Sequence, residues 1–314
     1  MKVTILGCGV MGGLLAAYLS RGGADVTVSD PNPAVSENIR KRGLLATFDG
    51  VTETFHNVRA YTDPSQIGEE PDLIIFLMKN DFTAAACEQA HCIIGPKTEI
   101  LSLQNGIGPV DVICEAYPGK DIMYGPMAVT GHIEEPGHSS VTVSKGFNIT
   151  FGNQSKTITP IMEQFAAIVN AGGLRCRPVE DIEPYVWLKL SGNCKNAILA
   201  LLRITIGTYA TQEERMAINN LVTDELDAVM KAMGIEFPPP APGTKPAVKG
   251  ALSPALLDHL PSTAQDVKAH RKTEVAYING AIVRAGRKYG VPTPVNEFIT
   301  LLLQVIEKTY DKQF

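Results

Sequence analysis

The stretch GCGVMG at residues 7–12 constrains the fold of this chain more than any other. It follows an apolar run, KVTIL, at residues 2–6, and it opens a helix-forming segment. The spacing fits G-x-G-x-x-G, in which Gly7 permits a tight turn, Gly9 lets a pyrophosphate approach the backbone and Gly12 lets helix and strand pack closely. The order of strand, glycines and helix predicts a dinucleotide-binding loop, and the alternative is a structural turn. The predicted cofactor-contacting residues here are Gly7, Cys8, Gly9, Val10, Met11 and Gly12.

A carboxylate ends the second predicted strand, DVTVSD, at Asp30. It lies about 20 residues after the glycine loop, where an acidic side chain accepts hydrogen bonds from an adenosine ribose. A carboxylate would repel a 2′-phosphate, and the following PNPAVSEN holds no lysine or arginine to attract one. Asp30 therefore favours NAD over NADP, which stays open as the second choice. The alternative role for Asp30 is an N-cap of the next helix.

Strands and helices alternate through the first part of the chain. The run DLIIFLMK at residues 72–79 is almost continuously apolar, which is typical of a strand buried on both faces of a parallel sheet. Its alternation with helical segments predicts an α/β fold with a Rossmann-type doubly wound parallel sheet. From about residue 122, alternating polarity and turn glycines predict antiparallel strands added to the sheet edge.

A chain of 314 residues is long for one core, so two domains are expected. We place the boundary near residue 178, where strand patterns give way to helical ones. Residues 1–178 would form the dinucleotide-binding domain, and residues 179–314 an all-helical domain for substrate binding and dimerisation. The expected helices span residues 181–202, 210–233, 253–260, 262–289 and 294–309.

The bulk properties exclude several classes of partner. The formal net charge is −5 and no basic block occurs, which argues against nucleic acid or an anionic membrane as partner. No apolar run approaches the ~20 residues that span a bilayer. The six cysteines form no CxxC pair and the six histidines show no ligand spacing, so we expect reduced thiols, a cytoplasmic location and no metal.

Two polar residues follow predicted strands of the sheet. Lys79 ends the buried run, and Asn105, in LQNGIG, ends the next one. Ligands of open α/β sheets bind beyond the carboxyl ends of the strands, so both side chains are candidates for the site. The alternatives are a solvated surface lysine and a simple Asn-Gly turn.

The segment WLKLSGNCKN carries unusual polarity for a helix in an apolar region. On one continuous helix, Lys189, Asn193 and Asn196 would share a face, while Trp187 packs elsewhere. Burying such a stripe without partners is costly, so it predicts a functional surface. The alternative is a stripe that faces solvent.

The segment PSTAQDVKAHRKTEVAYING supplies the last candidates. Ser262 is expected to cap a helix, with Gln265 completing a capping box. Asp266 and Arg271 suggest a local ion pair. Glu274 lies a little over three turns from Ser262 along this helix, so the two residues are expected roughly on one face.

Taken together, these segments resemble the ketopantoate reductase (2-dehydropantoate 2-reductase) family over essentially the full length. The matching pieces are GCGVMG, the strand-end Lys79, LQNGIG, EEPG, WLKLSGN and PSTAQD…RKTEVAYING. The resemblance implies a Rossmann domain joined to a helical domain, with the active site in the cleft between them. It also implies hydride transfer from C4 of a reduced nicotinamide to C2 of a 2-oxo acid, a reaction of pantothenate biosynthesis.

The resemblance also implies a role for each matching residue. Lys189 would be the general acid that protonates the developing alkoxide, and Glu274 the paired carboxylate near the substrate hydroxyl. A small 2-oxo or 2-hydroxy acid is the expected partner, with a homodimer through the helical domain. The residues expected at the substrate are Asn193, Asn196, Ser262 and Asn105, with Lys79 and Asn105 at the nicotinamide.

The chain departs from the family pattern at the cofactor phosphate site and in the substrate pocket. The usual arginine after the second strand is missing, and Asn193 and Asn196 are three rather than four residues apart. His259 and Ile206 stand where the family usually has asparagines. We therefore expect either a 2-dehydropantoate-like branched acid or another 2-hydroxy acid as substrate. A β-hydroxyacid dehydrogenase and a nicotinamide-binding redox sensor are the competing interpretations of the whole chain.

Overall fold

The computed structural model describes residues 1–142, 148–239 and 257–313. The chain divides into two compact units. Unit 1 holds Met1–Gln104 and Pro109–Ile182, and unit 2 holds Asn105–Gly108 and Glu183–Phe314. The boundary expected near residue 178 lies a few residues before the passage of the chain into unit 2.

Unit 1 is built on an eight-stranded sheet in the order β12-β11-β8-β7-β6-β1-β2-β5. All neighbouring strands are parallel except β8 and β11. Because β1 lies between β2 and β6, the strand order reverses direction there, which confirms the doubly wound α/β fold. The strands are β1 (Lys2–Leu6), β2 (Asp25–Ser29), β5 (Arg59–Tyr61), β6 (Leu73–Phe76), β7 (Glu99–Ser102), β8 (Met123–Tyr124), β11 (Ile149–Asn153) and β12 (Cys176–Pro178).

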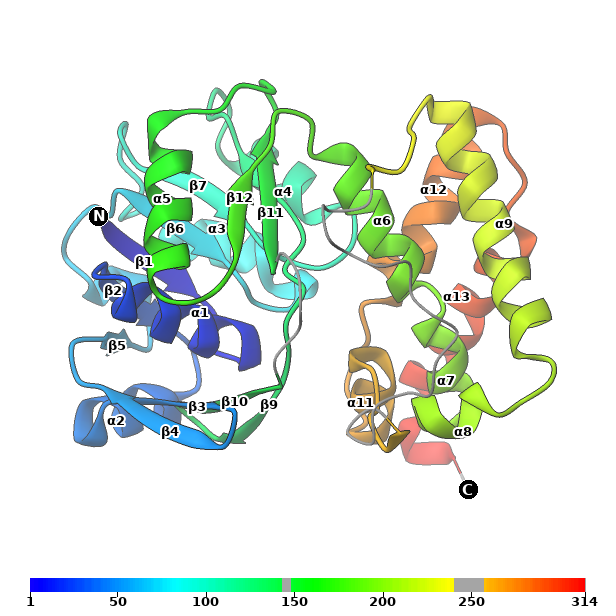
Figure 1. The fold of residues 1–314 in the computed structure, drawn as a ribbon, viewed down its shortest axis with the longest axis horizontal. Helices are drawn as coiled ribbons and strands as arrows, with labels where there is room; N and C mark the ends of the chain where they lie inside the picture. Colours follow the sequence, from blue (N-terminus) through cyan, green and yellow to red (C-terminus); the bar gives the residue numbers. More distant parts are fainter. Residues whose placement is uncertain (143–147, 240–256, 314) are drawn as a thin grey trace. The chain divides into compact units, whose positions relative to one another are not determined.

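Helices cover both faces of this sheet (Figure 1). Strand β6 shows why its run is apolar throughout: Leu73 and Ile75 belong to the core under α1 and α5, whereas Ile74 and Phe76 belong to the core under α3 and α4. A strand with a helix layer on each side has no solvated face. The helices of unit 1 are α1 (Val10–Arg21), α2 (Pro33–Arg42), α3 (Thr83–Ala90), α4 (Pro109–Ala116) and α5 (Pro160–Ala171), with short 3₁₀ turns η1 (Pro64–Gln66) and η2 (Asn80–Phe82).

The added strands divide between two sheets, which corrects the expectation that all of them extend the main sheet. Strands β8 and β11 do extend it, but β9 and β10 form a second sheet in the order β4-β3-β10-β9. The hairpin of β3 and β4 was not expected, although its signal is an Asp-Gly pair: Asp49 and Gly50 have φ of 50° and 83°, as a two-residue hairpin turn requires. The strands are β3 (Leu44–Phe48), β4 (Val51–Phe55), β9 (Thr130–Glu135) and β10 (His138–Thr142).

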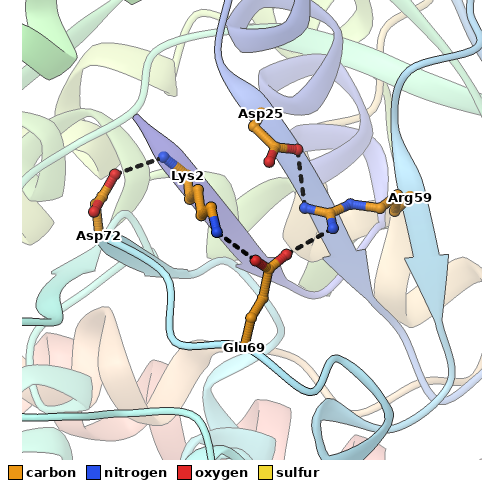
Figure 2. A network of polar contacts seen from close by, with 5 residues as sticks. All are labelled: Lys2, Asp25, Arg59, Glu69 and Asp72. Carbon is orange, nitrogen blue, oxygen red and sulfur yellow. Dashed lines mark hydrogen bonds and ion pairs between the residues drawn. The ribbon is translucent and has the colours of Figure 1, made fainter.

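An ion-pair network fixes the amino ends of the central strands (Figure 2). Glu69 accepts from the Lys2 ammonium at 2.5 Å and from Arg59 at 2.6 Å, and Arg59 also binds Asp25 at 2.9 Å. The backbone N–H of Lys2 donates to Asp72 at 2.7 Å. The two cations hold the pKa of Glu69 below its ordinary value. These contacts join β1, β2, β5 and the loop before β6 at the end of the sheet opposite the glycine loop.

The described part of unit 2 is helical, as expected. Helices α9, α12 and α13 pack against one another (Figure 1). The expected helix at residues 253–260 lies mostly outside the described residues. The helices are α6 (Glu183–Asn193), α7 (Asn196–Leu202), α8 (Ile206–Ala210), α9 (Arg215–Met233), α11 (Ser262–Lys268), α12 (Asn279–Tyr289) and α13 (Pro294–Lys308), with 3₁₀ turns η3 (Val275–Tyr277) and η4 (Tyr310–Lys312).

Two of the expected helices are broken, which corrects both predictions of a shared helix face. Helix α6 ends at Asn193 and α7 begins at Asn196, so these asparagines lie on different helices. Helix α11 ends at Lys268, before Glu274. The chain turns at His270, whose φ is 51°, a left-handed conformation that commonly ends helices.

The local contacts of α11 also differ in part from expectation. Ser262 is the first residue of the helix, Pro261 occupies the cap position, and no side chain caps the helix. Gln265 donates instead to the carbonyl of Leu260 at 2.7 Å, so the expected capping box is wrong. The expected ion pair of Arg271 with Asp266 is present, at 3.0 Å.

Candidate functional site

The three glycines of the loop have different structural needs. Gly7 has φ of 92°, and a Cβ there would lie 2.9 Å from the backbone nitrogen of Met78. A Cβ on Gly12 would overlap the carbonyl oxygen of Gly7. Nothing lies within 4 Å of a Cβ on Gly9. Gly7 and Gly12 are therefore required by the fold itself, while Gly9 leaves open space beside the backbone.

The start of α1 offers the environment that a dinucleotide pyrophosphate needs. Gly9 is the N-cap residue, no side chain caps the helix and its first turn holds no acidic residue. Unpaired N–H groups and the helix dipole favour an anion at such an end. Val10 and Met11 are half-buried, while Cys8 is buried and burial raises the pKa of its thiol to about 12. The glycine loop thus fits the dinucleotide expected from the sequence.

Asp30 binds the glycine loop directly. Its Oδ2 accepts from the backbone N–H of Cys8 at 2.8 Å, and its Oδ1 accepts from the N–H of Asn32 at 3.0 Å. Helix α2 is capped by Asn32, which accepts from the N–H of Ala34 at 3.1 Å. The alternative role of Asp30 as that N-cap is therefore wrong.

Lys79 lies just beyond β6, at the carboxyl end of the sheet. It is half-buried, and its carbonyl accepts from the N–H of Phe82 at 3.0 Å, which starts η2. Gly7 lies beyond β1, the neighbour of β6 in the sheet. Lys79 and the glycine loop thus follow adjacent strands of unit 1.

Residues 105–108 leave the sheet and join the helical unit. The N–H of Ile107 donates to the carbonyl of Tyr277 at 2.9 Å, and Arg284 donates to the carbonyl of Ile107 at 2.9 Å. Gly106 has φ of 80°, and a Cβ there would overlap the carbonyl oxygen of Tyr277. The Asn-Gly pair therefore serves a close backbone approach, and Asn105 projects into the helical unit.

This loop brings Asn105 to Glu274. The amide of Asn105 donates to Glu274 Oε2 at 3.5 Å, and Glu274 is only 7% exposed. Glu274 precedes η3, and its carbonyl accepts from the N–H of Tyr277 at 2.9 Å. The residue before it, Thr273, donates through backbone and hydroxyl to Glu307 on α13. Two of the predicted site residues thus meet at a carboxylate that is fixed on both sides.

Lys189 lies on α6 between two residues of the helical core. Trp187 and Leu190 are each 2% exposed, and Lys189 itself is half-buried. Burial lowers the pKa of the Lys189 ammonium from its ordinary value. No hydrogen bond or ion pair joins this ammonium to any residue within the described ranges. The exposed positions of the helix are Leu188 and Gly192, while Lys189 and Asn193 are half-buried.

The remaining substrate candidates are distributed over the helical unit. Asn193 and Asn196 are half-buried on either side of the α6–α7 break, and Ser262 is exposed at the start of α11. The two residues that depart from the family pattern lie together, since the N–H of Ile206 donates to the carbonyl of His259 at 3.1 Å. The two departures from the family pattern are therefore adjacent in the structure.

Arg284 is a residue of this region that was not predicted from the sequence. Besides the carbonyl of Ile107, its guanidinium binds the carbonyl of Ala276 at 2.6 Å, so it joins residues 105–108 to η3. Its signal was a lone arginine in the apolar run AIVRAG. A cation in such a run commonly has a specific acceptor.

Two family descriptions match nearly the whole chain. "Ketopantoate reductase PanE/ApbA" matches residues 3–156, and "Ketopantoate reductase PanE/ApbA C terminal" matches residues 181–307. The 2-dehydropantoate 2-reductase of Streptococcus pyogenes serotype M1 is 30% identical over 317 residues, covering 100% of both chains. The chain belongs to the ketopantoate reductase family. The family assignment decides against a β-hydroxyacid dehydrogenase and a redox sensor, and it makes the chain an NAD(P)-dependent oxidoreductase acting on CH–OH groups.

Other similar proteins match this chain over almost their whole length. The 2-dehydropantoate 2-reductase of Aquifex aeolicus (strain VF5) is 29% identical over 310 residues, covering 98% of this chain and 97% of that protein. A solved family member from Ralstonia eutropha JMP134 has a TM-score of 0.86 at 26% identity, covering 99% of this chain and 100% of that one. D-mandelate dehydrogenase, solved with NADH and anilino(oxo)acetate, has a TM-score of 0.87 at 26% identity with the same coverage.

Metal ligands and membrane-spanning helices are both missing from the described part of this ketopantoate reductase family member. Within residues 1–142, 148–239 and 257–313, no three His, Cys, Asp or Glu side chains gather as ligands for a metal ion. No helix in those same ranges combines the length and the apolar character needed to cross a bilayer.

The partly buried ammonium of Lys189 should lower the stability of the fold. Because the pKa of Lys189 is lower in the folded state than in the unfolded chain, stability is reduced below the folded pKa and recovers as pH rises toward 10.5. Replacing a buried charge by an apolar side chain of similar shape is commonly neutral or stabilising. Lys189→Met should therefore raise Tm at pH 7 by about 2–4 °C, the shift that about 1 kcal/mol produces in a medium-sized domain.

Thermal unfolding from pH 7 to pH 10 checks this expectation. The advantage of Lys189→Met over the natural protein should shrink as pH rises above the folded pKa. Lys231→Met, at an exposed position in the last turn of α9, is the control and should give no gain. A Tm loss for Lys189→Met at pH 7 would mean that the ammonium has a stabilising partner.

Proposed function

We propose that this protein reduces a branched 2-oxo acid to the 2-hydroxy acid, with Lys189 as the general acid. The observation that carries the proposal is a desolvated ammonium, on a helix of the core, without a partner in the described part of the chain. A partly desolvated charge in this condition is costly to the fold and is typical of functional sites. The family supplies the reaction type, and Lys189 supplies the group that the reaction needs.

The proposed chemistry divides between cofactor and protein. A bound reduced nicotinamide supplies the hydride that forms the new C–H bond at C2 of the acid. As the carbonyl bond breaks, negative charge develops on its oxygen, and the Lys189 ammonium stabilises this charge and donates the proton. Burial brings the pKa of Lys189 closer to the working pH, which favours proton transfer. Solvent then returns a proton to the amine.

The polar residues of the helical unit would orient the acid. Glu274 would accept a hydrogen bond from the substrate hydroxyl, and the Asn105 amide supports this role because it holds one of the carboxylate oxygens. Asn193 and Ser262 would donate to the hydroxyl and carboxylate of the substrate. Asn196, on the helix after the break, would contribute to substrate choice.

We further propose that NADH is the preferred cofactor, bound by residues 7–12 with Asp30 at the ribose and Lys79 at the nicotinamide side. Asp30 lies against the loop, and no lysine or arginine follows it within residues 31–38. A carboxylate in this place accepts hydrogen bonds from ribose hydroxyls and repels a phosphate. The NADH complex of the similar D-mandelate dehydrogenase is consistent with this preference.

A second candidate substrate is a 2-hydroxy acid with a larger apolar group at C2. It is favoured by Ile206, an apolar residue next to His259 where the family usually has polar ones, and by the likeness to a D-mandelate dehydrogenase. Burial lowers the pKa of His259, so its ring is mainly neutral near pH 7. A panel of branched, linear and aryl 2-oxo acids, with NADH and NADPH, separates the two candidates by kcat/KM.

The cysteines support a cytoplasmic location. All six are free thiols. Burial raises the pKa of Cys176 and Cys194, which keeps these thiols protonated and unreactive. A protein that retains six free cysteines suits a reducing compartment.

Loss of Lys189 should abolish most of the turnover. Lys189→Ala is expected to lower kcat by at least about 10²-fold, the lower end for loss of a general acid. Leu188→Ala is the matched control, because Leu188 is an exposed neighbour on the same helix. The initial rate of NADH oxidation with the best acid of the panel is the measurement, and near-normal turnover in a folded Lys189→Ala protein would refute the assignment.

Neutralising Asp30 should shift the cofactor preference. Asp30→Asn keeps an oxygen that can accept from Cys8 but removes the charge that would repel a 2′-phosphate. One charge pair at about 4 Å is worth about 1 kcal/mol in water and more when partly buried, so the NADPH/NADH ratio of kcat/KM should rise by about 5-fold or more. Asp25→Asn, at the other end of β2, should leave the ratio unchanged. An unchanged ratio in Asp30→Asn removes Asp30 from this role.

We also propose a homodimer through α13. Beside its buried face, this helix exposes an apolar stripe at the i, i+3, i+4, i+7 spacing, formed by Phe298, Leu301, Leu302 and Val305. The spacing is symmetric about the middle of the stripe, so a two-fold axis there pairs Phe298 with Val305 and Leu301 with Leu302 of an antiparallel second copy. Glu297 near one end and Lys308 at the other give opposite charges to the facing ends.

A charge in the middle of this stripe should separate the subunits. Leu301→Glu is expected to halve the molar mass measured by light scattering after size-exclusion chromatography, since it would place two carboxylates at the axis. Val51→Glu, at a similarly exposed apolar position on β4, should leave the mass unchanged. A monomeric natural protein, or a dimeric Leu301→Glu protein, contradicts the proposed interface.

A further inference from the structure

The break between α6 and α7 leaves a buried carbonyl in need of a donor. In a continuous helix the carbonyl of Cys194 would accept from the N–H of Ile198. That N–H donates instead to the carbonyl of Lys195 at 3.1 Å, and the N–H of Cys194 still closes α6 on Leu190 at 2.8 Å. Cys194 is fully buried, so its carbonyl cannot turn to water.

Asn279 supplies the missing donor. Its Nδ2 donates to the carbonyl of Cys194 at 3.0 Å and to Asn296 Oδ1 at 3.0 Å, and its side chain is 1% exposed. Asn279 is the first residue of α12, and only Ile278 separates it from the η3 turn that follows Glu274. One side chain therefore connects the end of the helix that carries Lys189 with the segment that carries Glu274.

The direction of this hydrogen bond is imposed by a carboxylate. Glu225 on α9 accepts from the backbone N–H groups of Val295 and Asn296 at 2.7 and 2.9 Å. Its Oε2 also accepts from Asn296 Nδ2 at 2.7 Å, and that Nδ2 donates to the carbonyl of Val222 at 3.0 Å. The amide nitrogen of Asn296 is thus committed to acceptors, and its oxygen is left to face Asn279. Asn279 must then donate to both of its neighbours.

The hydrogen bonds of Asn279 carry a cost in stability that packing alone does not explain. Asn279 Oδ1 is buried and has no hydrogen-bond partner in the described part of the chain. A buried acceptor without a donor lowers stability, and an apolar residue followed by an unbroken helix would avoid it. Buried polar groups kept at such a cost are expected where function requires a defined geometry.

We propose that Asn279 is a positioning residue that sets the place of Lys189 relative to Glu274. The inference rests on the proposed roles of those two residues and adds the side chain of Asn279, which fixes their relative position. Lys189 lies on the helix that Asn279 holds at its end, so a shift of that end moves the ammonium with it. A misplacement of about 1 Å by a distant change can lower the rate by about 10²-fold.

Two substitutions test the role. Asn279→Ala removes both donors, and Asn279→Asp keeps the shape but turns a carboxylate toward two acceptors, so the aspartate should be the more harmful. We expect kcat to fall by about 10-fold to 10²-fold, while KM for NADH changes far less. The alkaline limb of the kcat–pH profile should move to higher pH, because water that reaches Lys189 raises its pKa toward the ordinary value.

The pH at which kcat falls on the alkaline side distinguishes a positioning role from a simple loss of folded protein. Asn153→Ala is the control: Asn153 is 2% exposed and its amide donates to Asp121 and to the carbonyl of Thr157, each at 2.8 Å, in unit 1. It should lower Tm without moving the limb. If the Asn279 variants do not fold, Asn296→Ala, which removes the acceptor that orients Asn279, should move the limb in the same direction.

The outcomes distinguish this inference from the proposed function. In the natural protein kcat should fall at alkaline pH, and this fall should be absent from the residual activity of Lys189→Met. A fall in kcat that persists in Lys189→Met refutes the general-acid role. If the limb depends on Lys189 but stays in place in folded Asn279→Ala, with kcat unchanged per folded molecule, Asn279 has no positioning role. A lowered kcat together with a shifted limb supports it.

Discussion

The partial burial of one ammonium, that of Lys189, is the physical constraint that the helical unit has to accommodate. Among the described residues this cation has no counter-charge, and its partial removal from water raises the free energy of the folded state, so the surrounding core has to hold its helix firmly. Trp187 and Leu190 do this on either side by packing into that core. The end of the helix is held by a hydrogen bond from Asn279, and that bond is oriented in turn by Glu225.

The two units are stabilised in different ways. In unit 1 the backbone has the larger role: glycines allow a tight turn and close approaches between backbone segments, and Asp30 holds the glycine loop through the backbone N–H of Cys8. In unit 2 side chains have the larger role, because amides and a carboxylate from α9, α12 and α13 hydrogen-bond to one another in the interior. The exposed backbone of the glycine loop suits a pyrophosphate, which accepts hydrogen bonds from N–H groups. The hydrogen-bonded side chains of unit 2 suit the fixed geometry of proton transfer.

The sequence predicted what depends on local pattern and missed what depends on distant contacts. The apolar run of β6, the glycine loop and the helical second half follow from periodicity and glycine spacing. The break after Asn193 does not, because the donor that satisfies Cys194 comes from Asn279, far along the chain. The end of α11 likewise depends on a left-handed residue, His270, that is not glycine. The hairpin at Asp49 and Gly50 was predictable, since its signal is local.

The excursion of residues 105–108 into the helical unit has a consequence for how the protein can be divided. The helical unit is discontinuous in sequence, because four of its residues are encoded within the other unit. A fragment that starts at Glu183 would lack Asn105, which binds Glu274, and Ile107, which anchors η3 through Tyr277. Recombination or gene fusion at residue 183 would therefore transfer a helical unit that lacks residues 105–108. An exchange of the helical unit would have to include residues 105–108 as well.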